Sequence, residues 1–158
     1  MDLVKINSFY NELKDNFKFS QIRSEEFLRY RILINPYIDF SILKLYNSNN
    51  TLCGYIIFSI NDNKVLIEDI LFLDDAVKQE LLNRLFNYIK SNKLAYAMSM
   101  TTLENSLLDS NYNAFLRRVN KSEGSDKLMI KNNIKEKFRD DLKIENFYFT
   151  KLMMEGIQ

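Results

Sequence analysis

The sequence predicts one α/β domain over residues 1–158, with a mixed and largely antiparallel sheet flanked by helices. Polar turns at residues 47–50 and 61–63 separate apolar runs rich in β-branched and aromatic side chains, which is typical of an antiparallel meander. Residues 76–90 have the apolar stripe of an amphipathic helix, and another apolar run follows at 94–100. A strand, a helix and a strand in this order predict one parallel crossover.

The residues before the first turn are expected to form helices. Residues 3–6 are too few to decide between a strand and the start of a helix. Asn7 or Ser8 can cap a helix whose apolar side chains recur every fourth residue, at Phe9, Leu13 and Phe17. Ser24, followed by two glutamates, predicts a second helix. Pro36 ends that region, because the residue before a proline disfavours helical geometry.

The remaining elements follow from the same patterns. The three strands of the meander are expected at residues 42–46, 52–60 and 65–73. Cys53 lies in the second strand, where a small buried thiol is the expected state. After the crossover we expect a short helix at 104–108, two strands at 114–119 and 127–130, and a last aromatic strand or edge at 147–149.

The composition excludes several classes of function. The chain has no histidine and one cysteine, which removes histidine-based catalysis, most zinc sites and an internal disulfide framework, and we expect no metal site. The net charge of +1 gives no electrostatic basis for binding nucleic acid or an anionic membrane. Because no run is apolar enough to span a membrane and no signal peptide is present, we expect a cytoplasmic protein.

Several short strings, taken in their order, give the chain a family resemblance. They are Phe27-Leu-Arg-Tyr-Arg31, Asn35-Pro-Tyr37, Gly54 near the start of its strand, Ile67-Glu-Asp-Ile70 and Asn146-Phe-Tyr-Phe149. With the element order, they resemble the GNAT acyltransferase fold from about residue 27 to residue 149. The resemblance also allows the chain to be the C-terminal part of a longer protein, and a homodimer is compatible with it.

The resemblance implies a transfer of an acyl group from acetyl-CoA or another acyl-CoA to a small amine, with an amino sugar as one candidate acceptor. Pantetheine would lie between two splayed parallel strands and bond the backbone of the first. That backbone corresponds here to Ile70, Leu71, Phe72 and Leu73. The pyrophosphate would lie at the start of the following helix, near Lys78 and Gln79.

The resemblance also implies a pair of proton-transfer groups. Glu68 or Asp69 corresponds to the carboxylate that removes a proton from the amine, and Tyr112 is the nearest match to the tyrosine that protonates the leaving thiolate. A carboxylate base suits a chain without histidine. Because Glu68 and Asp69 are adjacent in a strand, we expect their side chains to point to opposite faces.

The sequence departs from the family at the pyrophosphate turn. The family pattern Arg/Gln-x-x-Gly-x-Gly/Ala is absent, and Asp74 and Asp75 stand at the start of the helix instead. Aspartate is a good helix cap, but its charge opposes a pyrophosphate at the same place. This departure supports an alternative: a non-catalytic GNAT-like module that has lost its donor site and serves in binding or assembly.

Overall fold

A computed structural model of the chain describes residues 3–17, 19–20, 22–99 and 147–148. Its helical elements are α1 (Leu3–Leu13), the 3-10 turn η1 (Lys14–Asn16), α2 (Glu25–Leu28), the π-helical turn η2 (Arg29–Leu33) and α3 (Asp75–Ser91). Its strands are β1 (Phe19–Ser20), β2 (Phe40–Tyr46), β3 (Leu52–Asn61), β4 (Lys64–Phe72), β5 (Ala97–Ser99) and β6 (Phe147–Tyr148).

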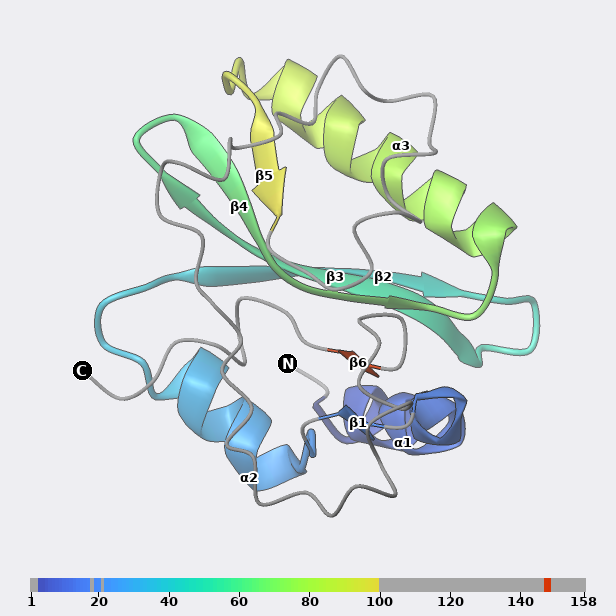
Figure 1. The fold of residues 1–158 in the computed structure, drawn as a ribbon. Coiled ribbons are helices and arrows are strands. Elements are labelled where there is room, and N and C mark those ends of the chain that lie inside the picture. Colours follow the sequence, from blue (N-terminus) through green and yellow to red (C-terminus); the bar gives the residue numbers. More distant parts are fainter. Residues whose placement is uncertain (1–2, 18, 21, 100–146, 149–158) are drawn as a thin grey trace, which may run out of the picture.

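The central sheet has the strand order β2-β3-β4-β5 (Figure 1). β2, β3 and β4 form an antiparallel meander, as the polar turns predicted. Val65–Ile67 of β4 pair in parallel with Ala97–Ser99 of β5, which the chain reaches through α3. β6 contains part of the predicted last strand, but it pairs with β1 in a separate two-stranded sheet. The predicted mixed α/β class, with an antiparallel meander of three strands and flanking helices, is therefore confirmed.

Helices cover both faces of the sheet, and the described residues form an apolar core on each face. α3 packs over one face, and α1 and α2 lie over the other (Figure 1). Alternate residues of β3 divide between the two cores: Ile56 and Phe58 pack with α3, whereas Tyr55 and Ile57 pack with α1 and α2. Because side chains alternate along a strand, this division shows which face of the sheet each other residue of β3 lies on.

Gly54 allows α3 to approach β3 closely. A Cβ atom at this position would lie 2.7 Å from Val77 Cγ1 and 2.8 Å from Leu81 Cδ1, both side chains of α3. Such distances are too short for carbon atoms in contact, so the glycine at the start of β3 has a packing role. Next to it, Cys53 is buried as expected.

The first helix begins earlier than its predicted cap. α1 starts at Leu3, and Asn7 lies inside it, so neither Asn7 nor Ser8 caps the helix. Leu3, Ile6 and Tyr10 are buried and lie at helical spacing. The helix therefore includes the apolar residues that precede Asn7. Phe17 follows η1 with an extended backbone, outside α1.

The second helix and α3 lie close to the positions that the sequence predicts for them. Ser24 caps α2 by accepting a hydrogen bond from the Phe27 amide, and the helical region ends before Pro36.

The predicted elements at 104–108, 114–119 and 127–130, like Tyr112, lie outside the described residues. Among the residues that are described, no helix has both the length and the apolar character needed to cross a membrane.

Candidate functional site

A β-bulge occurs in β4 at the two candidate carboxylates. Ile57 of β3 pairs with Asp69 and the next residue, Phe58, pairs with Ile67, so Glu68 is an extra residue in β4. A bulge bends its strand and changes the direction of the side chains that follow. Bulges are common beside active sites, because they aim a side chain that regular pleating would turn away.

The bulge brings Glu68 and Asp69 to the same face of the sheet. Tyr55 and Ser59 are an even number of residues apart in β3, on the face that packs against α1 and α2. The Tyr55 hydroxyl donates to Asp69 Oδ2 at 2.9 Å, and the Ser59 hydroxyl donates to Glu68 Oε1 at 2.7 Å. The expectation of opposite faces is therefore wrong, because it assumed regular alternation through the bulge.

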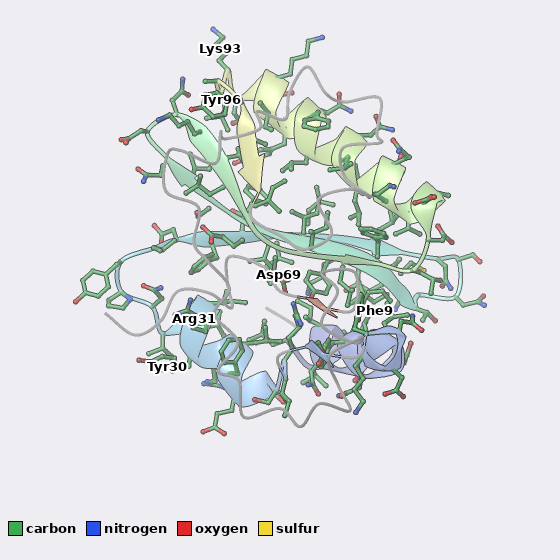
Figure 2. The ribbon with its side chains drawn as sticks, viewed as in Figure 1. Phe9, Tyr30, Arg31, Asp69, Lys93 and Tyr96 are labelled. Atoms are coloured by element: carbon green, nitrogen blue, oxygen red, sulfur yellow. The ribbon has the colours of Figure 1, made fainter. Side chains whose placement is uncertain are left out.

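Asp69 is the centre of a buried ionic network. Arg23, in the loop before α2, donates from Nε to Oδ2 and from Nη2 to Oδ1, both at 3.1 Å. The Ile70 amide also donates to Oδ1, at 3.1 Å. Arg23 and Asp69 are both fully buried, and Asp69 lies between the sheet and the layer of α1 and α2 (Figure 2).

α1 completes the surroundings of the Arg23 guanidinium. The Arg23 guanidinium carbon lies 5.0 Å from the centroid of the Tyr10 ring, and the Asn7 side-chain amide donates to the Arg23 carbonyl. Each oxygen of the Asp69 carboxylate already accepts two hydrogen bonds, which is the number that a carboxylate oxygen usually accepts. Asp69 therefore acts as an anchor that joins β4 to the N-terminal helical layer.

The sequence reasoning missed Arg23. Its position just before a helix cap gives no sign that the side chain is buried. The available signal was indirect: a carboxylate inside an apolar strand must be paired with a cation or with several donors, and β4 itself supplies neither close to Asp69.

Glu68 differs from Asp69 in its surroundings. Its side chain is buried, with the residue 1% exposed, and it accepts the short hydrogen bond from the neutral Ser59 hydroxyl. A hydroxyl donor of this kind orients the carboxylate. Of the two predicted candidates for a general base, Glu68 is the one whose described hydrogen bond does not belong to the Arg23 network.

The start of α3 is occupied by the chain's own charges. Asp74 is the N-cap: its carboxylate accepts from the Val77 amide at 2.9 Å, as the capping interpretation predicted. The Lys78 ammonium forms a 2.7 Å ion pair with Asp75 and lies 5.8 Å from the centroid of the Phe72 ring. Lys78 is buried and Gln79 is half-buried, so neither is a simple surface group.

The backbone expected to bind pantetheine lies at the end of β4. Ile70 and Leu71 are buried, Phe72 is half-buried and Leu73 is exposed. Within the described residues, the pairing of β4 with β5 covers only Val65–Ile67, so these four residues lie beyond it. The Leu73 amide donates to the Cys53 carbonyl at 2.9 Å, on the side of β3.

Other described features lie apart from the two carboxylates. A surface depression is formed by α1 and the β2–β3 turn and is lined by Lys5, Ser8, Phe9, Glu12, Asn50, Thr51 and Leu52. In the described ranges, no three acidic or cysteine side chains gather in a way that could hold a metal ion. No model of a known protein family matches the chain, and no curated protein sequence matches it.

Proposed function

We propose that the chain is a GNAT-like N-acyltransferase that uses acetyl-CoA or another acyl-CoA and acts on a small amine, with an amino sugar as one candidate. The observation that carries the proposal is the bulge at Glu68, in the strand that joins the antiparallel meander to β5. The bulge places a buried carboxylate on β4 just before the segment that is expected to hold pantetheine.

In the proposed reaction, Glu68 removes a proton from the acceptor ammonium or amine, directly or through water. The amine nitrogen then attacks the thioester carbonyl. The new C–N bond forms as the C–S bond breaks, and the CoA thiolate takes up a proton. By family resemblance, Tyr112 is the candidate donor of that proton. The backbone of Ile70, Leu71, Phe72 and Leu73 orients the donor, which lowers the entropic part of the barrier.

The described contacts support different roles for the two acidic residues of β4. Asp69 would have to leave Arg23 and Tyr55 before it could accept a proton from a ligand, which makes it a poor base. Glu68 is the residue that the bulge inserts into β4, and the Ser59 hydroxyl orients its carboxylate. The proposal therefore takes Glu68 as the base and Asp69 as its structural neighbour.

Calorimetric titration with acetyl-CoA and with free CoA tests donor binding. Release of free thiol in the presence of a panel of amines and amino sugars then tests transfer. We expect Glu68→Gln to bind acetyl-CoA as the unmodified chain does and to lose turnover. Ser41→Ala, at an exposed position of β2, is the matched control. Full turnover in the Glu68→Gln variant would overturn the assigned base.

A second candidate function is a GNAT-like binding or assembly module without catalysis. It is favoured by the start of α3, where Asp74 occupies the cap and Asp75 holds the Lys78 ammonium. Both features place negative charge where a pyrophosphate would bind. If neither acetyl-CoA nor CoA binds at millimolar concentration, the acyltransferase proposal fails and this module is the remaining candidate.

A further inference from the structure

The exposed apolar side chains are concentrated on one short segment. Of the nine large hydrophobic residues that are exposed in the described part of the chain, five lie between residues 22 and 37: Ile22, Tyr30, Leu33, Ile34 and Tyr37. Their exposed fractions range from 47% to 92%. Scattered single apolar residues are normal on a surface, but a contiguous group marks an interaction site.

The helical geometry explains why Tyr30, Leu33 and Ile34 share one face with the exposed charged residues of α2 and η2. Along α2 and η2, the buried residues Leu28 and Ile32 are four apart, and the exposed pairs 25–26, 29–30 and 33–34 recur with the same spacing. The wider π-helical turn of η2 keeps the four-residue repeat in register. Tyr30, in η2, accordingly lies at the periphery of the molecule (Figure 2).

The charges on this face are ordered. Glu25 and Glu26 are exposed in the first turn of α2, and Arg29 is exposed one turn later. In the described part of the chain, none of these three side chains forms an ion pair. The face therefore carries a negative end, a positive centre and an apolar region that contains Leu33.

This order is complementary to itself when two copies meet in antiparallel fashion. A two-fold axis midway between residues 26 and 29 places Glu26 opposite Arg29 of the second copy. The same axis places Glu25 opposite the Tyr30 hydroxyl of the second copy. These two pairings join opposite charges and a carboxylate with a donor, as a two-fold interface requires.

We propose that the outer face of α2 and η2 is a homodimer interface, occupied by the same face of a second copy of this chain. The proposal is independent of acyl transfer, because it rests on the exposed side of α2 and η2 and not on the carboxylates of β4. The face is short, so the dimer is weak and its population depends on protein concentration.

Sedimentation equilibrium of the full chain over a range of concentrations tests the proposal. We expect a reversible monomer–dimer equilibrium. Glu26→Arg and Arg29→Glu should each raise the dimer Kd by about tenfold or more, because each places like charges opposite one another. Leu33→Asp should weaken the dimer in the same direction by burying a charge in the apolar part of the face.

A mixture of the two charge-reversed variants provides the decisive test. Glu26→Arg makes the face basic and Arg29→Glu makes it acidic, so an equimolar mixture of the two variants should form a heterodimer although each alone is monomeric. Glu80→Arg and Arg84→Glu are the matched controls, since they change the net charge equally at an exposed ion pair on α3. Both controls should dimerise like the unmodified chain.

Each alternative result overturns the proposal. A chain that stays monomeric at the highest accessible concentration has no such interface. A dimer that tolerates Glu26→Arg, Arg29→Glu and Leu33→Asp uses a different surface. A mixture of the two charge-reversed variants that stays monomeric shows that the charges do not meet between copies.

Discussion

Arg23 donates two hydrogen bonds to Asp69, from Nε and Nη2 to the two carboxylate oxygens, with both residues fully buried. The pair links the loop before α2 to the centre of β4. It fixes the N-terminal helical layer against the sheet at the residue that follows the bulge. The first prediction therefore concerns stability.

Replacing Arg23 with Met should leave the Asp69 carboxylate buried without its cation. We expect the free energy of unfolding to fall by about 3–5 kcal/mol, the usual cost of breaking a buried ion pair. Urea unfolding followed by circular dichroism measures the change. The double variant Arg23→Met with Asp69→Asn should recover part of the loss, since no unpaired charge then remains. A change below about 1 kcal/mol, as at exposed pairs, would contradict the structural role given to Asp69.

The hydrogen bond between Ser59 and Glu68 gives a second prediction, which can be tested separately from the first. Ser59→Ala removes one donor to a buried carboxylate, so we expect a loss of about 1–3 kcal/mol in urea unfolding. Glu68→Gln keeps an oxygen that accepts from Ser59, and its loss should be smaller. Equal losses in the two variants would mean that the Ser59 hydroxyl does not orient Glu68.

The bulge shows where reasoning from the sequence stops. The meander, α3 and the caps at Ser24 and Asp74 were predictable, because each depends on residues close together in the chain. The shared face of Glu68 and Asp69 was not, because a strand's alternation does not reveal an inserted residue. Arg23 was missed for a related reason: its partner is distant in sequence, and only the tertiary fold brings the two together.

The cap of α3 gives a third prediction. Asp74→Ala removes the acceptor of the Val77 amide and should destabilise the domain by roughly 0.5–2 kcal/mol. Asp74→Asn retains a capping oxygen and should cost less. Thermal unfolding of both variants beside the unmodified chain makes the comparison. If the asparagine variant is as unstable as the alanine variant, the charge of Asp74 matters more than its hydrogen bond.

Gly54 supports the fourth prediction, which tests the packing of α3 on β3. In Gly54→Ala the new methyl group would meet Val77 and Leu81 at 2.7 and 2.8 Å, so the helix or its side chains must move. We expect a loss of about 1–3 kcal/mol, typical of overpacking in a core. Because Val77 lies in the first turns of α3, the displacement should also broaden the amide NMR signals of that helix end. Ser41→Ala, which adds no atoms at an exposed strand position, serves as the control and should change stability by less than about 0.5 kcal/mol. A Gly54→Ala variant as stable as this control would show that β3 and α3 pack less closely than the distances indicate.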